Sequence, residues 1–341
     1  MYFKYILMKN KIFKVGGLFS GVGGIELGFS NKQKFQISWA TDFDKYSAKT
    51  YRKNFNHTFY EKDINDLLGK DLEEVDVLVG GFPCQAFSVA GYQKGFEDER
   101  GDVFFQIIRL INELPKKPEV LLLENVKNIY THDNKKTFKI IQDSLEQTGY
   151  CVFSEIMNTC DYTSVPQNRE RTFIICFLEG KHAFLDPTKP KSTHFKKIFP
   201  PEKILKLKPI SHFLENNEVD EKYYYRQGKY NNYDKLRKSI TKLDTFYQWR
   251  RVYVRENKSG VCPTLTANMG TGGHNVPLIR DSYGIRKLTP RECFNLQGFP
   301  KKFKLPKDVP NTQLYKQAGN SVTVDMFKKL SEIIYQCLLR N

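Results

Sequence analysis

Short apolar runs alternate with amphipathic helical patterns through the first half of the chain. Six of these runs are predicted as strands, at residues 12–19, 35–41, 75–81, 119–125, 150–157 and 172–178. Helices are predicted between them at residues 44–54, 102–114 and 137–147, where apolar side chains recur at helical spacing. Strands that alternate with helices form βαβ units, so the pattern predicts an α/β fold with an open, mostly parallel sheet.

The second half of the chain has a different pattern. Residues 181–285 show no clear alternation, whereas residues 322–339 are again helical and are expected to pack back on the sheet. We predict a main domain of residues 11–180 and 315–341, and a second, smaller domain of residues 181–314. Ligands of open α/β sheets bind at the carboxyl ends of the strands, so the loops after the predicted strands are the places to search for chemistry.

Charge is concentrated in the second half. The 341 residues include 54 Lys and Arg against 38 Asp and Glu, a net charge of +16. Residues 181–285 alone hold 20 basic and 10 acidic residues, interleaved with aromatic side chains. This composition favours a polyanionic partner, such as nucleic acid or an anionic membrane surface. The simpler interpretation is a solvated, irregular domain whose charges keep it soluble.

Targeting and metal signals are not found in the sequence. No apolar run approaches the roughly 20 residues that span a bilayer, and the apolar, basic start has no small-residue cleavage site. The seven cysteines include no C-x-x-C pair, and no His lies at ligand spacing from another His or Cys. We therefore expect a cytoplasmic, reducing location with neither a disulfide framework nor a metal site.

A glycine-rich turn follows the first predicted strand. It reads FSGVGGIE from Phe19 to Glu26, with Gly21 and Gly23 where the backbone could approach a ligand closely. Glu26 occupies the third glycine position of the G-x-G-x-x-G fingerprint, and there is no G-K-[ST] sequence of a P-loop. Taken alone the turn is weak evidence, because tight turns require glycine for steric reasons.

Acidic residues follow the next two strand positions. Asp42 ends the second strand, where a carboxylate can hold ribose hydroxyls, and Phe43 beside it could stack on a ring. Asp63 and Ile64 follow a third segment, where Asp63 could bind an adenine amino group. Together with the glycine turn, these residues predict a cofactor that contains adenosine and has no phosphate cradle.

A cysteine follows the strand at 75–81. Most lone cysteines are structural, but Cys84 lies in a strand-end loop behind the rigid Pro83, and a glycine-rich segment that resembles a mobile lid follows it at 86–101. Glu124 ends the next strand behind an apolar run, where a partly desolvated carboxylate is suited to share or donate a proton; a helix N-cap or a surface acid is the alternative. A Cys/Glu pair at adjacent strand ends favours nucleophilic catalysis.

Two arginines precede the last strand of the first half. Arg169 and Arg171 are two residues apart, so on a strand both would point to the same face and could enter the cleft. Arginine donates to carbonyl or phosphate oxygens in fixed geometry. An edge-strand charge pair is the simpler interpretation.

Together these segments resemble a known family, the cytosine-C5 DNA methyltransferases of bacterial restriction-modification type. The resemblance covers the chain from about residue 12 to its end, apart from a variable region at 181–260. It rests on six segments in the family's order: FSGVGGIE at 19–26, GGFPCQAFS at 80–88, ENV at 124–126, QNRER at 167–171, RKLTPREC and LQGFP within 286–300, and QAGNSV at 317–322.

The resemblance implies a fold, a reaction and a cofactor. The fold is the Rossmann-like sheet of S-adenosylmethionine-dependent methyltransferases, with the second domain as a target-recognition domain for double-stranded DNA. A cytosine is flipped into the cleft, and Cys84 attacks its C6 atom. Glu124 then holds N3 and the exocyclic amine, and Arg171 binds O2 with support from Arg169. C5 takes the methyl group from S-adenosylmethionine.

The resemblance also implies binding residues. The segment at 262–275 is similar to the part of the family that reads bases, and the lid at 85–101 would close over DNA. The implied cofactor residues are Phe19, Gly21, Gly23, Asp42, Phe43, Asp63, Ile64, Pro83 and Asn320. The implied DNA-binding residues are Gln85, Ser88, Arg251, Thr264, Thr266, Gly270 and Gly272.

One departure from the family pattern lies in the first strand. It reads VGGLF, with Gly16 and Gly17 where the family usually has an acid or a bulky apolar residue. This departure bears on the packing of the strand and on cofactor affinity. We expect a monomer, and a cognate restriction endonuclease would be a functional partner only.

Three other interpretations compete. An RNA cytosine-C5 enzyme uses the same scaffold, because a tRNA-directed branch shares these motifs; the wide basic region favours duplex DNA. A non-catalytic DNA-binding relic is opposed by the intact Cys84, Glu124 and Arg171. A nicotinamide oxidoreductase is disfavoured by Glu26 in the fingerprint position.

Overall fold

The computed structural model describes residues 11–83, 103–182, 185, 198–199, 206–271 and 275–340. Cys84, Gln85, Ser88, Gly272 and the predicted lid from Gln85 to Gly101 lie outside the described residues. The structure therefore describes the loop that leads to Cys84 only as far as Pro83.

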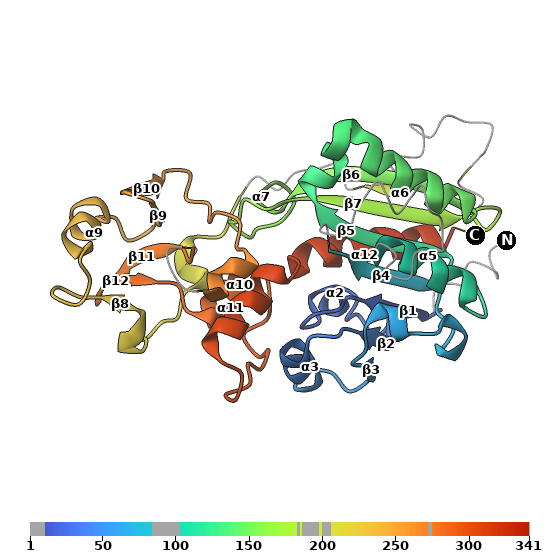
Figure 1. Ribbon diagram of the computed structural model, residues 1–341, viewed down its shortest axis with the longest axis horizontal. Coiled ribbons are helices and arrows are strands. Elements are labelled where there is room, and N and C mark those ends of the chain that lie inside the picture. The colour runs from blue at the N-terminus through green and yellow to red at the C-terminus, as the bar shows by residue number, and fades with distance from the viewer. Residues whose placement is uncertain are drawn as a thin grey trace.

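The larger of two sheets contains seven strands among the described residues, in the order β3-β2-β1-β4-β5-β7-β6 (Figure 1). The first five are parallel to one another, whereas β7 is antiparallel to both β5 and β6. This confirms the α/β fold and the mostly parallel sheet. The strands are β1 (Phe13–Leu18), β2 (Phe35–Thr41), β3 (Thr58–Tyr60), β4 (Val77–Gly81), β5 (Val120–Val126), β6 (Tyr150–Asn158) and β7 (Glu170–Leu178).

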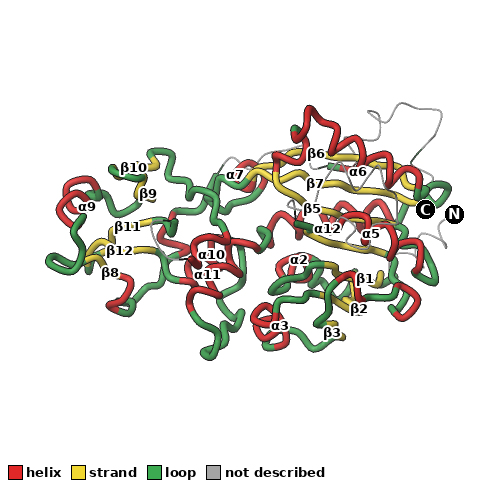
Figure 2. Tube along the Cα trace, in the orientation of Figure 1, coloured by secondary structure: helices red, strands yellow, loops and turns green. Residues whose placement is uncertain are grey.

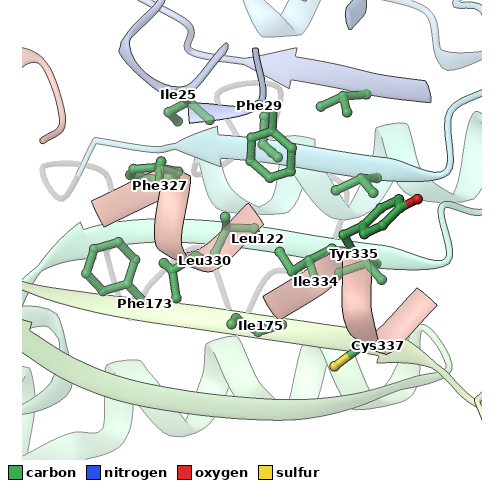
Figure 3. Packing of buried hydrophobic residues seen from close by; sticks show 14 of the residues in the cluster. Ile25, Phe29, Leu122, Phe173, Ile175, Phe327, Leu330, Ile334, Tyr335 and Cys337 are labelled. Atoms are coloured by element: carbon green, nitrogen blue, oxygen red, sulfur yellow. The ribbon is translucent and has the colours of Figure 1, made fainter. Parts of the chain in front are cut away.

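Helices cover both faces of this sheet because its strands are apolar on both sides. On one face α2 (Gly24–Gly28) and α12 (Val324–Leu338) pack on residues such as Leu122, Phe173 and Ile175 (Figure 3). On the other face lie α5 (Val103–Glu113) and α6 (Lys136–Gln147). The predicted return of the C-terminal helix to the sheet is confirmed.

The remaining helices near the seven-stranded sheet are short. Asp44 begins α3 (Lys45–Arg52), where its side chain accepts from the backbone N–H groups of Tyr46 and Ser47, as N-cap aspartates commonly do. The other short segments are α7 (Thr159–Tyr162) and the 3₁₀ turns η1 (Ile64–Asp66), η2 (Gly69–Asp71), η5 (Lys127–Tyr130) and η6 (His132–Lys135).

The double glycine in β1 has a packing explanation at its first position. A Cβ atom on Gly16 would lie 2.7 Å from Cε2 of Trp39, a fully buried residue of β2. The pairing of β1 with β2 shifts between Val15 and Gly16, which brings Trp39 opposite Gly16. Glycine at this position therefore makes room for the indole ring.

A second sheet lies in the region where the sequence pattern predicted no regular structure. Five antiparallel strands among the described residues have the order β10-β9-β11-β12-β8. Figures 1 and 2 show this sheet at the opposite end of the molecule from the seven-stranded sheet. Its strands are β8 (Tyr224–Tyr225), β9 (Phe246–Arg250), β10 (Tyr253–Asn257), β11 (Leu278–Asp281) and β12 (Gly284–Lys287).

Helical segments accompany the second sheet. They are η7 (Ile210–Phe213), η8 (Glu221–Tyr223), α9 (Tyr233–Ser239), η9 (Ala267–Thr271), α10 (Pro290–Leu296) and α11 (Asn311–Asn320). A buried Arg286 on β12 binds both carboxylate oxygens of Glu292 on α10 at 2.8 Å, which fixes the sheet to this helix. The predicted domain boundary at residue 315 falls within α11. Among the described helices, none has the length and apolar character needed to cross a bilayer.

Candidate active site

The turn after β1 has a backbone conformation that favours glycine. Phe19, Gly21 and Gly23 all have positive φ angles, of 53°, 55° and 90°, and the left-handed region is costly for residues with a side chain. A side chain on Gly23 would also collide with the ring of Phe55. The turn is tied to β2 because the Ser20 N–H donates to the Thr41 carbonyl at 2.9 Å.

Asp42 connects this turn to the end of β2. Its Oδ2 accepts from the Gly21 N–H at 2.8 Å, and its Oδ1 accepts from the Asp44 N–H at 2.9 Å. Burial raises the pKa of the Asp42 carboxyl, although these two hydrogen bonds oppose the rise. Phe43 beside it is 67% exposed. A positioned carboxylate therefore lies next to an exposed aromatic ring and a tight glycine turn.

Asp63 and Ile64 have different environments. Asp63 is partly exposed, and its Oδ1 accepts from the backbone and side-chain nitrogens of Asn65 at 2.9 and 2.7 Å. The Ile64 side chain is buried in the core with α5, and its carbonyl accepts from Arg109 at 2.9 Å. Of this pair, Asp63 is the residue with side-chain atoms near the surface.

Glu124 and Arg171 form an ion pair at the carboxyl end of β5. The Arg171 Nε lies 2.9 Å from Glu124 Oε1, and both side chains are largely buried, at 15% and 10% exposure. The β-sheet register places Glu124 opposite Gly81 on β4 and Arg171 opposite Val126 on β5. The acid and the arginine that the sequence suggested are therefore in contact, and Glu124 is level with Gly81, the last residue of β4, from which the Cys84 loop departs.

Asn125 holds the described start of the Cys84 loop. Its Nδ2 donates to the Phe82 carbonyl at 2.9 Å, and the Phe82 ring packs on Phe104 of α5. Pro83 then lies exposed at the end of the described segment. Asn125 was not predicted as a site residue from the sequence, although a polar residue at the end of an apolar strand was an available signal.

Arg169 has other hydrogen-bond partners than Arg171, although burial and the Arg171 charge lower its pKa and the Glu124 charge raises it. It is 3% exposed and donates to three backbone carbonyls, those of Leu265 at 2.8 Å, Gly319 at 3.3 Å and Ser321 at 2.6 Å. The predicted role of Arg169 beside Arg171 in catalysis stays a prediction. Its placement on the same strand face as Arg171 does not hold, because β7 begins at Glu170 and Arg169 precedes the strand.

The predicted DNA-binding residues that the structure describes lie in two segments. Arg251 is exposed in the two-residue turn between β9 and β10, with a positive φ of 52°. Thr264 donates its hydroxyl to the Asn168 carbonyl, and Thr266 is exposed. Gly270 packs closely on the Thr312 carbonyl of α11, so steric contact accounts for this glycine.

Asn320 ends α11 next to the glycine turn. It is exposed, and its neighbour Ser321 lies against Gly24, the first residue of α2. The carbonyls on either side of it are the ones that Arg169 binds. Arg169 therefore fixes the segment that carries Asn320 to the start of β7.

Comparison with known proteins agrees with this geometry. A family model described as C-5 cytosine-specific DNA methylase matches residues 13–336. The chain is 48% identical over 327 residues to the type II methyltransferase M.Bsp6I of Bacillus sp. (strain RFL6), which covers 96% of this chain and 99% of that protein. It is 32% identical over 326 residues to the type II methyltransferase M.HhaI of Haemophilus parahaemolyticus, covering 92% and 91% of the two chains.

Solved structures have the same fold. The crystal structure of S. pombe Dnmt2 methyltransferase aligns with a TM-score of 0.70 at 20% identity, covering 96% of this chain and 98% of that one. The match to the family model spans all seven strands of the larger sheet, the glycine turn and the Glu124–Arg171 pair. The chain belongs to the C-5 cytosine-specific DNA methylase family.

Proposed function

We propose that this chain transfers a methyl group to C5 of a flipped cytosine in a specific duplex DNA sequence, as the modification enzyme of a restriction-modification system. The observation that carries this proposal is the Glu124–Arg171 pair, which lies beside the β4 loop that leads to Cys84. Family membership supports the reaction class.

The chemistry follows from the low reactivity of cytosine at C5. The Cys84 thiolate forms a bond to C6. The electron pair of the C5=C6 double bond is released toward C5, which makes C5 nucleophilic, while Glu124 shares a proton with N3. Arg171 donates to O2, where negative charge develops. After C5 has been methylated, loss of the C5 proton and cleavage of the Cys84–C6 bond restore the double bond.

The ion pair explains why Glu124 is oriented before the base arrives. Arg171 holds one carboxylate oxygen through its Nε, and its Nη1 donates to the Glu170 carbonyl at 2.8 Å. The fixed guanidinium can donate to O2 of cytosine, and the fixed carboxyl group can accept from the exocyclic amine and, when it carries a proton, donate to N3. Pre-ordering of this kind lowers the cost of reaching the transition state.

The residues at the ends of β1 and β2 fit S-adenosylmethionine. The positive-φ turn of Phe19, Gly21 and Gly23 leaves backbone close to a ligand, Asp42 supplies a carboxylate, and exposed Phe43 offers a ring face. Asp63 follows β3, Pro83 follows β4, and Asn320 ends α11. When bound, S-adenosylmethionine supplies an electrophilic methyl group.

The second sheet is proposed to read the DNA sequence. The β9–β10 turn exposes Arg251 together with Val252 and Tyr253, which are 71% and 59% exposed. Basic and aromatic side chains on a narrow hairpin suit contact with phosphates and base edges. Replacing Arg250 and Arg251 by Ala should weaken DNA binding. It should also reduce the slope of the logarithm of the binding constant against the logarithm of the salt concentration by about two. Exposed Lys235→Ala and Lys238→Ala on α9 serve as a charge-matched control.

The test measures methyl transfer from labelled S-adenosylmethionine to duplex DNA and to tRNA in parallel. We expect label in duplex DNA, with 5-methylcytosine at one sequence context. Transfer to tRNA alone would favour the RNA enzyme, and transfer to neither would favour a non-catalytic relic. Cytoplasmic location on DNA, a monomeric state and pairing with a cognate restriction endonuclease are further parts of the proposal.

A further inference from the structure

A buried acid that the proposed reaction does not use lies under the glycine turn. Glu26, on the single-turn helix α2, is 1% exposed. Among the described residues, neither of its carboxylate oxygens makes a well-formed hydrogen bond. A buried carboxylate without a well-formed hydrogen bond is costly, so it requires an explanation beyond packing.

The position of this carboxyl group is set by the second glycine of β1. A Cβ atom on Gly17 would collide with Glu26 Oε1 and would lie 2.7 Å from the Ser20 hydroxyl oxygen. The Glu26 carboxyl therefore fills the space that a side chain at residue 17 would take. Ser20 belongs to the glycine turn, and its hydroxyl makes no well-formed hydrogen bond among the described residues either.

We propose that Glu26 is a positioning residue that supplies negative charge beneath the cofactor turn and favours the positively charged methyl donor over its neutral demethylated product. This inference rests on the proposed function, because it requires S-adenosylmethionine at the turn. Methyl transfer converts the sulfonium of the donor into an uncharged thioether. A buried carboxylate would therefore attract the substrate and not the product, and would assist product release.

The surroundings of Glu26 allow its charge to vary near neutral pH. Burial raises the pKa of Glu26 to about 7, the Ser20 hydroxyl and the helix backbone lower it, and the Asp42 charge raises it. Tyr51 of α3 faces the same group, and its pKa is raised by burial and by Glu26. The positive charge of Lys316 on α11 lowers the pKa of Asp42, and Lys316 forms an ion pair with Asp44 at 3.0 Å. Glu26 thus gains charge as the pH rises through neutrality.

The size of the effect follows from Coulomb's law. At an effective dielectric constant of about 20, the attraction between two opposite unit charges roughly 10 Å apart raises the affinity about tenfold. Only the ionised fraction of Glu26 contributes. The preference for donor over product should therefore grow about fivefold between about pH 6 and about pH 8.5.

The experiment measures the dissociation constants of S-adenosylmethionine and S-adenosylhomocysteine by calorimetry at both pH values. The proteins are the wild type, Glu26→Gln and the control Glu155→Gln, which removes a carboxyl of raised pKa on edge strand β6. We expect the preference to grow in the wild type and the control, and to stay nearly constant in Glu26→Gln. Ionisation of the ligands and of Asp42 is common to all three proteins and cancels in the comparison.

Two results would overturn the inference. One is a wild-type preference that does not change with pH, which decides the matter even if Glu26→Gln fails to fold. The other is a folded Glu26→Gln protein, verified by thermal unfolding, that keeps the wild-type pH dependence. If the wild type binds neither compound, the proposed function itself fails, and this inference fails with it.

Discussion

Arg169 and Arg171 offer a matched pair of substitutions with opposite expected effects. Arg169→Lys replaces a guanidinium that reaches three carbonyls, on residues 265, 319 and 321, by an ammonium that cannot reach all of them. Each buried carbonyl left without its donor costs about 1 kcal/mol or more. With two of them lost, the free energy of unfolding should fall by about 2–3 kcal/mol.

Arg171→Lys is expected to behave differently. The lysine keeps a positive charge beside the buried Glu124 carboxylate, so no uncompensated charge is left and the free energy of unfolding should fall by only about 1 kcal/mol. The lysine lacks the fixed fork of the guanidinium, however, so it cannot contact Glu124 and the base at the same time. Methyl transfer should therefore slow by at least about tenfold while the protein remains stable.

The assay combines thermal unfolding with single-turnover methyl transfer for both variants. For a chain of this size, about 2–3 kcal/mol corresponds to a fall in Tm of roughly 3–4 °C for Arg169→Lys. The reasoning is refuted if Arg169→Lys keeps the wild-type Tm and loses only the rate of methyl transfer. That result would place Arg169 in the cleft beside Arg171, as the sequence spacing first suggested.

Three further predictions concern single residues of the main domain. Glu124→Gln should lower the methylation rate at least about 10²-fold with DNA binding retained; an unchanged single-turnover rate would remove Glu124 from the chemistry. Gly16→Ala should lower the free energy of unfolding by about 1–3 kcal/mol in urea, because its methyl group meets Trp39; an unchanged midpoint would contradict this packing. Glu26 has a pKa raised from 4.5 unfolded to about 7 folded, so its ionisation costs stability that is absent below pH 4.5 and grows until about pH 7. The free energy of unfolding of Glu26→Gln, measured relative to wild type, should therefore be higher at pH 8 than at pH 4 by up to about 3 kcal/mol. A difference in urea unfolding that does not change with pH would argue against a buried, titrating carboxyl.

The seven-stranded sheet was predictable because its strands are buried on both faces. Continuous apolar runs such as 119–125 stand out from the amphipathic helices between them. Strand β3 was missed, since three residues are too few to produce a pattern. The second sheet was missed for a similar reason, because strands such as β8, with two residues, alternate over too short a length.

The candidate site divides in the same way. Glu124 lies near the carboxyl end of β5 and Asp42 directly follows β2, and local position was enough to find them. The partners of Arg169 are 96 and 150 residues away along the chain, so no local spacing encodes them. Gly17 and Glu26 are a second example: the glycine is conspicuous in the sequence, but only the packing of α2 on β1 reveals which carboxyl fills the space beside it.

The central claim is covalent catalysis by Cys84 on a cytosine in DNA, and a mechanism-based substrate tests it most directly. A duplex that contains the methylation site with 5-fluorocytosine in place of cytosine cannot lose a proton from C5, so the Cys84–C6 bond should persist after methyl transfer. In the presence of S-adenosylmethionine, we predict a protein–DNA species that resists denaturing electrophoresis and whose mass shows the linkage at Cys84. Cys84→Ser should bind the same duplex without forming this species. Wild-type protein that methylates cytosine yet forms no such species, or Cys84→Ser protein that methylates at the wild-type rate, would contradict the account.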